Sequence, residues 1–141
     1  MMIKLRAKSK SQFEKTLWTW FSRFIRLRDA DRNGMCKCIT CKKIFFWKEG
    51  DAGHFISRNH KATKYDIQNV NAQCIHCNRF QSGNQFEHGL AIDDKFGSGT
   101  AQKLLIKSKM ACKRKESDYF YLIEEYKNKA KQEASKKGIT I

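Results

Sequence analysis

The stretch that decides the fold holds two Cys-x-x-Cys pairs on either side of a histidine. It opens with Cys38-Ile-Thr-Cys41, passes through Asp51-Ala-Gly-His54 and closes with Cys74-Ile-His-Cys77. Zinc in structural sites is bound by four thiolate or imidazole ligands in a tetrahedron, and two such pairs supply four thiolates. The sequence therefore predicts a zinc ion bound by Cys38, Cys41, Cys74 and Cys77. Because this ligand set is closed, we expect the zinc to be structural.

The remaining cysteines and the start of the chain bear on this interpretation. Met1–Lys10 lacks the apolar segment of a secretory signal, and no apolar run approaches the length of a membrane span. We therefore expect a cytoplasmic protein without a membrane partner, in a reducing compartment where such motifs bind zinc rather than form disulfides. Cys36 could compete as a ligand, although four cysteines already suffice. Cys112 lies in a basic segment predicted to be helical, where we expect a packed thiol.

The charge balance predicts a polyanionic partner. The 141 residues include 29 Lys and Arg against 14 Asp and Glu, which gives a formal net charge of +15. A strongly basic chain is attracted most often to nucleic acid, and its binding should weaken steeply with salt as counterions are released. This length favours a single domain, 1–141, with a core over 36–84 between an N-terminal helix and a helical basic extension.

The segment 1–30 is predicted to be a basic amphipathic helix. Ser11 and Glu14 have the spacing of a capping box, which places the start of the helix at Gln12. Apolar residues recur at helical spacing while the opposite face is basic. The helix should therefore cover the core, and its basic face is a candidate for contacts with phosphates. The apolar stripe consists of Phe13, Leu17, Trp20, Phe21, Phe24, Ile25 and Leu27.

Between the cysteine pairs the sequence predicts a β-hairpin. Ile44–Trp47 is the first strand, Lys48–Gly50 a tight turn in which Gly50 is free to take positive φ, and Asp51–Ile56 the returning strand. The polar segment 57–68 is predicted to be a loop. A helix should begin near Asn78 and be interrupted at residues 82–84. The helical basic extension, 85–137, should contain helices over 85–95, over 101–110 and from about 117 onward.

His54 has a possible role in chemistry as well as in packing. An imidazole near its ordinary pKa can accept a proton from water at pH 7. That water can attack a phosphodiester if a divalent cation stabilises the phosphate charge and the leaving oxygen. The alternatives are a histidine packed beneath the cysteine pairs or one that replaces a cysteine ligand, and the second is weak when four cysteines are present.

This order of parts resembles the HNH nuclease motif, a ββα-metal fold. The resemblance implies that His54 is the general base and that Asn69 ties the loop and orients that base. It also implies that Asn78, where many relatives have histidine, binds a catalytic Mg²⁺ or Mn²⁺. The fold class it implies is α+β: a zinc-stapled, HNH-like or treble-clef-like ββα-metal core with N- and C-terminal helices.

A narrower resemblance is to the NinG/Rap recombination family of lambdoid phages. It rests on Asp51-Ala-Gly-His54, Gln73-Cys-Ile-His-Cys-Asn78 and Ser82-Gly-Asn84, and it extends more weakly from about Phe13 through the C-terminal helices. It implies a structure-selective, metal-dependent endonuclease that cuts branched recombination intermediates such as Holliday junctions and D-loops. If the chain is phage-encoded, the bacterial host cytoplasm is the expected location.

Two residues depart from the usual HNH pattern. Gly53 stands where relatives have an Asp or His that binds the metal. Strand alternation places Asp51 on the same side as Gly53, so Asp51 could supply the missing carboxylate. Gln81 stands where relatives tend to have a lysine that contacts phosphate.

Several further residues are assigned from their type and position. The predicted DNA contacts are Arg58, Lys61, Lys64, Arg79, Lys103 and Lys107. Asn71 is an alternative to Asn69 as the orienting residue, but its spacing to Cys74 fits the motif less well. We expect His76 to face solvent and His88 to lie on the surface of a helix.

Two other functions compete with this hypothesis. A non-catalytic zinc-finger protein that binds DNA would explain the cysteines and the charge, but not His54, Asn69 and Asn78 at motif spacing. An HNH endonuclease that prefers a sequence over a structure would explain all of them. Two symmetric cuts in a two-fold junction would suit a homodimer, so a second copy is a possible partner.

Overall fold

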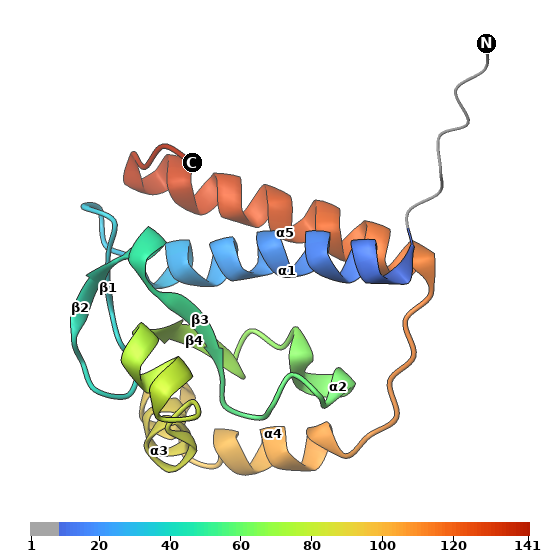
Figure 1. The fold of residues 1–141 in the computed structure, drawn as a ribbon, viewed down its shortest axis with the longest axis horizontal. Coiled ribbons are helices and arrows are strands. Elements are labelled where there is room, and N and C mark those ends of the chain that lie inside the picture. Colours follow the sequence, from blue (N-terminus) through green and yellow to red (C-terminus); the bar gives the residue numbers. More distant parts are fainter. Residues whose placement is uncertain (1–8) are drawn as a thin grey trace.

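Two long helices form one side of the protein. A computed structural model describes residues 9–141, in which α1 (Lys10–Asp29) and α5 (Glu116–Lys137) lie side by side and run in the same direction (Figure 1). Polar contacts join them at both ends. Tyr119 Oη donates to Glu14 Oε1 at 2.6 Å, and Lys137 Nζ donates to the Arg28 carbonyl at 3.0 Å. No described helix is long and apolar enough to cross a membrane.

The helix α1 begins before the predicted residue. Its capping box is formed by Ser9 and Gln12: Gln12 N–H donates to Ser9 Oγ at 3.3 Å, and Ser9 N–H donates to Gln12 Oε1 at 2.8 Å. The predicted box of Ser11 with Glu14 is wrong, because the Glu14 carboxylate is held by Lys64, Tyr65 and Tyr119 instead. Residues 1–8 of the predicted basic helix lie outside the described residues.

The predicted hairpin is also wrong, because its two strands have other partners. β1 (Met35–Lys37) pairs antiparallel with β2 (Ile44–Phe46), and β3 (Asp51–His54) pairs antiparallel with β4 (Val70–Gln73). Between β2 and β3 the chain forms a 3₁₀ turn, η1 (Trp47–Glu49), which buries the Trp47 ring. Gly50 has an extended φ of −137° and packs against the Phe45 ring, so it does not use the positive φ that was open to it.

Short helical segments lie on either side of the second cysteine pair. The predicted loop 57–68 contains a short helix, α2 (Lys61–Lys64). The helix predicted near Asn78 is a single π-helical turn, η2 (His76–Phe80). Positive φ at Ser82, Gly83 and Asn84 produces the predicted interruption.

The helical extension agrees with the prediction in outline. α3 (Gln85–Phe96) and α4 (Thr100–Ser108) are separated by Gly97 and Gly99, which both have positive φ. α5 begins one residue before the predicted start. Cys112 lies in the irregular segment between α4 and α5, so its predicted helical setting is wrong.

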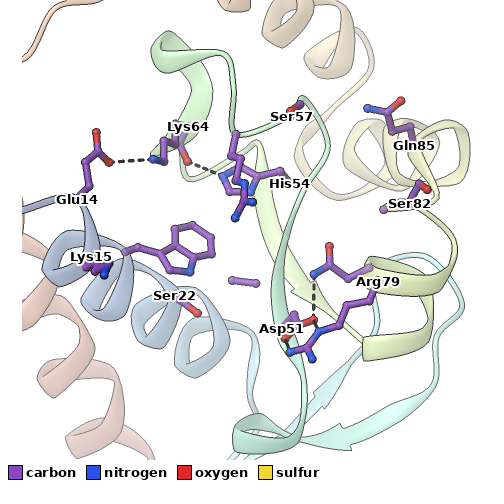
Figure 2. Close-up of a pocket in the computed structure, with 15 residues that line it drawn as sticks. Glu14, Lys15, Ser22, Asp51, His54, Ser57, Lys64, Arg79, Ser82 and Gln85 are labelled. Atoms are coloured by element: carbon purple, nitrogen blue, oxygen red, sulfur yellow. Dashed lines mark hydrogen bonds and ion pairs between the residues drawn. The ribbon is translucent and has the colours of Figure 1, made fainter. Parts of the chain in front are cut away.

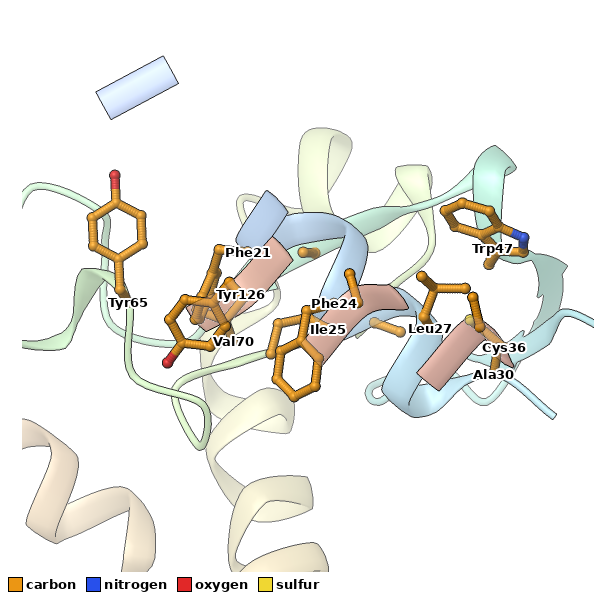
Figure 3. Close-up of a cluster of buried hydrophobic side chains, with 14 of the residues drawn as sticks. Phe21, Phe24, Ile25, Leu27, Ala30, Cys36, Trp47, Tyr65, Val70 and Tyr126 are labelled. Carbon is orange, nitrogen blue, oxygen red and sulfur yellow. The ribbon is translucent and has the colours of Figure 1, made fainter. Parts of the chain in front are cut away.

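The main core lies between α1, α5 and the sheets. α1 contributes Leu17, Phe21, Ile25 and Leu27, which are fully buried, and α5 contributes Tyr126 (Figure 3). The Phe21 ring meets the Tyr126 ring edge-on, with centroids 4.7 Å apart. This packing confirms the interpretation of the α1 stripe as a core-facing surface. The smaller second core under α3 and α4 consists of Ile39, Ile56, Ile92 and Leu104.

Candidate metal centre and adjoining pocket

The four predicted cysteines come together. The Sγ atoms of Cys38, Cys41, Cys74 and Cys77 all lie within 4.8 Å of one another, and they form a possible metal site. The Cys41 and Cys74 sulfurs are 3.7 Å apart. A zinc–sulfur distance of about 2.3 Å implies a tetrahedron edge of about 3.8 Å, so the donor set and its spacing fit a structural zinc.

The loop of the first cysteine pair is stabilised locally. Lys42 adopts a positive φ of 68°, and its N–H donates to the Cys38 carbonyl at 3.0 Å. Thr40 Oγ1 lies 3.2 Å from Cys38 Sγ, and Cys77 N–H donates to Cys74 Sγ at 3.4 Å. Such contacts orient sulfur ligands in metal sites.

Cys36 is not part of this cluster. Its thiol is buried and donates to the Arg26 carbonyl at 3.2 Å. Burial raises the pKa of Cys36 to about 12, with the Asp29 carboxylate as a further cause. The thiol is therefore neutral and belongs to the core.

A pocket of about 660 Å³ lies between α1, β3 and the turn after η2 (Figure 2). Six residues assigned from the sequence line this pocket: Asp51, His54, Arg58, Lys64, Asn78 and Arg79. The pocket therefore brings together the three candidate groups His54, Asp51 and Asn78, which are separated by up to 27 positions. Asn69 and Asn71 do not line it.

The ring of His54 is held by two contacts. Its Nε2 lies 2.9 Å from the Lys64 carbonyl oxygen, and its ring stacks on Trp18 with centroids 5.0 Å apart. Because a carbonyl only accepts hydrogen bonds, Nε2 carries the proton and Nδ1 is left as the basic nitrogen. Burial, with the charges of Lys64 and Arg58 as smaller causes, lowers the pKa of His54 to about 4. The imidazole is therefore neutral at pH 7.

Asn69 fixes the loop that follows His54. Its side chain is fully buried, and Oδ1 accepts from Ile56 N–H at 2.8 Å. Its Nδ2 donates to the carbonyls of Ile56 and Thr63, each at 3.0 Å. Asn69 therefore binds the backbone on both sides of residues 57–62.

Asn71 occupies a different environment. Its Oδ1 accepts from Arg28 Nη2 at 3.0 Å and from Lys95 Nζ at 2.9 Å, and its Nδ2 donates to the Gln68 carbonyl at 3.1 Å. These contacts link α1, α3 and β4 away from the pocket.

Asp51 is the carboxylate nearest to Asn78. Asn78 Nδ2 donates to Asp51 Oδ2 at 3.0 Å, and Arg79 donates through Nε and Nη2 to the two carboxylate oxygens, each at 2.9 Å. Burial would raise the pKa of Asp51, but the hydrogen bonds from Arg79 and Asn78 outweigh it and hold the pKa below its usual range. Asp51 is therefore ionised at neutral pH.

The predicted DNA contacts divide into two groups. Arg58, Lys64 and Arg79 line the pocket, whereas Lys61, Lys103 and Lys107 lie outside it. Three of the six are engaged in ion pairs within the protein: Lys64 with Glu14 at 2.9 Å, Arg79 with Asp51 at 2.9 Å and Lys107 with Asp66 at 2.5 Å.

Among the pocket residues that sequence reasoning did not assign to the site are Glu14, Lys15 and Trp18. Glu14 is the only acidic residue in the basic segment before Asp29, and this isolation was the available signal. Trp18 was missed because it lies outside the stripe that faces the core.

Two histidines near the site differ in exposure. His76 is exposed as predicted and lies 3.2 Å from Gln81 Nε2. His88 was predicted to be on the surface, but it is fully buried in α3, with its ring 5.9 Å from that of Phe55. Neither ring nitrogen of His88 has a hydrogen-bond partner among the described residues.

The fold and these sites define a small α+β protein with a four-cysteine cluster that can bind a metal, and with a pocket lined by basic residues. The family model described as "Bacteriophage Lambda NinG protein" matches residues 2–137, and the chain belongs to the NinG family. The predicted family resemblance is confirmed at that level.

The NinG proteins of Salmonella phage P22, Escherichia phage 933W and Enterobacteria phage VT2-Sa are each 28% identical to this chain over 102 residues. The match covers 72% of this chain and 48% of each relative, so the chain spans about half the length of the curated relatives it matches. No solved structure matches the chain.

Proposed function

We propose that this protein is a metal-dependent DNA endonuclease of the HNH type, with a structural zinc on the four cysteines. The observation that supports it best is the state of His54, whose Nε2–H is bound to the Lys64 carbonyl while Nδ1 remains basic. The partly buried imidazole is neutral at pH 7 and has a fixed tautomer, so Nδ1 is free to take a proton from water. Its pKa of about 4 makes it a weaker base than the imidazole of ordinary pKa expected from the sequence. Its pocket also holds an ionised carboxylate, Asp51, and the amide of Asn78.

The residues present fit a catalytic Mg²⁺ or Mn²⁺. Magnesium is commonly held by one or two carboxylates, together with waters and substrate phosphate oxygens. Asp51 offers a carboxylate and Asn78 an amide oxygen, both hard ligands, from neighbouring elements β3 and η2. When bound, such a cation stabilises the developing charge on the phosphate and the leaving oxygen.

The protein groups then have distinct roles. His54 accepts the proton of the attacking water through Nδ1, and its ring is held in place by Trp18 and the Lys64 carbonyl. Asn69 keeps the loop between His54 and Lys64 in shape through its three hydrogen bonds. Arg58 and Lys15, which line the pocket, are positioned to bind phosphates of the cut strand.

The proposed substrate is branched DNA, such as a Holliday junction or a D-loop. The net charge of +15 supports a polyanionic substrate, and the choice of branched DNA rests on the NinG/Rap resemblance.

The test is cleavage of a four-way junction and of linear duplexes with Mg²⁺ or Mn²⁺. We expect junction cleavage by the wild type and a loss of about 10²- to 10⁴-fold in His54→Ala, with DNA binding retained. His60→Ala, which removes an exposed histidine six residues away, is the matched control. Absence of cleavage with both metals would reject the enzyme and favour a non-catalytic zinc protein that binds DNA. Preference for one linear sequence would favour a sequence-preferring HNH enzyme.

A further inference from the structure

Arg79 is bound to the Asp51 carboxylate, which is the group that the proposed cation would bind. Its guanidinium binds Asp51 in the two-pronged geometry, with Nε on Oδ2 and Nη2 on Oδ1, each at 2.9 Å. The same Oδ2 accepts the Asn78 amide at 3.0 Å. Asp51 therefore has both oxygens engaged, and its negative charge is balanced by one arginine.

A divalent cation and this arginine compete for Asp51. A magnesium ion binds a carboxylate oxygen at about 2.0–2.1 Å, which would bring its charge close to a guanidinium held 2.9 Å from the same oxygens. Two positive groups so close repel each other strongly in a partly buried site. One of them must leave when the other binds.

Arg79 is the partner that can move. Its side chain is 61% exposed, against 18% for Asp51, and it lies on the short turn η2, while Asp51 is held in the β3–β4 pair. All its side-chain hydrogen bonds within residues 9–141 are to Asp51. Once released, its fork is free to bind a phosphate, for which guanidinium geometry is well suited.

We propose that Arg79 is an exchange residue: it neutralises Asp51 in the free protein, leaves when the cation binds and then binds a phosphate of the DNA. This rests on the proposed function and specifies how its site is loaded. The cation binds Asp51 and the phosphate binds Arg79. The free-energy cost of breaking the Asp51–Arg79 ion pair therefore has to be met only once when both ligands bind. Cation and DNA should therefore bind cooperatively.

The experiment measures Mn²⁺ binding to the zinc-loaded protein by electron paramagnetic resonance and calorimetry, with and without a four-way junction. The variants are Arg79→Gln, Arg79→Lys and Asp51→Asn. Arg32→Gln is the matched control, because it removes the same charge from an exposed turn between α1 and β1.

Without DNA, we expect Arg79→Gln to bind Mn²⁺ roughly two- to fivefold more tightly than Arg32→Gln, since a competing ion pair has been removed. Arg79→Lys should fall between wild type and Arg79→Gln, because lysine lacks the fork. Asp51→Asn should lose this binding. Junction DNA should tighten Mn²⁺ binding in the wild type and do so less in Arg79→Gln.

Equal Mn²⁺ affinity in Arg79→Gln and Arg32→Gln, or binding that survives Asp51→Asn, would overturn the exchange. These outcomes are independent of the nuclease assay. A wild type that does not cut DNA, yet shows the expected affinities, would reject the proposed function and leave the Asp51–Arg79 exchange standing as a cation-linked contact.

Discussion

The side chain of Gln73 occupies the space in which a side chain at Gly53 would begin. A Cβ built on Gly53 would lie 3.0 Å from Gln73 Cβ and closer still to Gln73 Oε1. Gln73 is held there because its Nε2 donates to the Gly83 carbonyl at 2.8 Å and to Thr40 Oγ1 at 3.2 Å. A side chain at residue 53 is therefore excluded sterically. Gln73 joins the first cysteine loop to the turn after η2.

We predict strong coupling between Gly53 and Gln73. Gly53→Ala should lower the free energy of unfolding by about 1–3 kcal/mol through overpacking. Gln73→Ala should also cost about 1–3 kcal/mol, because the Gly83 carbonyl loses its buried donor. In the double variant the closest contact, with Gln73 Oε1, is gone and the 3.0 Å approach of the two Cβ atoms remains. The total loss should therefore be smaller than the sum by about 1 kcal/mol or more. Urea denaturation of the four proteins measures this, and additive losses would refute the contact.

We predict that removal of one cysteine ligand destabilises the whole core. Cys74→Ser should lose bound zinc and cost several kcal/mol, because structural zinc contributes directly to folding. The expected fall in Tm is about 10 °C or more. Elemental analysis and thermal denaturation measure the two effects. Cys112→Ser, outside the cluster, is the control and should keep one zinc per chain. A Cys74→Ser protein with full zinc content would show that the cluster is not the site.

We predict that Glu14 stabilises the protein by joining three segments. Its carboxylate accepts from Lys64, Tyr65 and Tyr119, so Glu14→Gln should cost about 1–3 kcal/mol at pH 7. Burial would raise the pKa of Glu14, but these hydrogen bonds outweigh it and lower the pKa to about 2. The folded pKa lies below the unfolded value, so this stabilisation is present above pH 4.5 and is lost as the pH falls towards 2.

Chemical denaturation between pH 7 and pH 3 tests this prediction. The gap between wild type and Glu14→Gln should narrow as the pH falls below 4.5. Glu124→Gln, on an exposed part of α5, should differ little from wild type at any pH. A constant gap across this range would contradict the assignment.

We predict that His88 makes the protein less stable in mild acid. Burial, together with the charge of Lys95 and the charge that His54 carries once it is protonated, lowers the pKa of His88 to about 4 from a usual value of 6.5. The unfolded chain takes up this proton first, so stability falls as the pH drops from about 6.5 to about 4.

Replacement of His88 should reduce this dependence. In His88→Leu the loss of stability between pH 7 and pH 5 should be smaller than in wild type by about 1–2 kcal/mol. His60→Leu, which removes an exposed imidazole, controls for the loss of a histidine. Equal losses in wild type and His88→Leu would show that His88 is not the group responsible.

The residues that could be predicted from the sequence are those whose partners follow a local rule. The cysteine spacing predicts the metal cluster, and helical periodicity predicts α1, α3, α4 and α5 to within a few residues. The proximity of Asp51 to Asn78 followed from strand alternation combined with the family motif, and the two side chains are in contact.

The strand pairing could not be predicted in the same way. Each strand has three or four residues, too few to show which strand pairs with which, and the Lys48–Gly50 sequence is compatible with a hairpin turn. Burial of Trp47 and packing of Phe45 on Gly50 decide the path instead. Similarly, Glu14 and Lys64 are 50 residues apart, so no sequence pattern predicts their contact. The contacts of His54 with Trp18 and with the Lys64 carbonyl also join segments that are distant in sequence.

The parallel packing of α1 on α5 has a consequence for synthesis of the chain. The cysteine cluster is complete once residue 77 has emerged from the ribosome, so zinc can be captured early. The apolar face of α1, however, packs on α5, and Tyr126 is more than 100 residues away from Phe21. Contacts so distant in sequence slow folding and leave apolar surface exposed for longer. The apolar face of α1 is therefore made long before α5, the helix on which it packs.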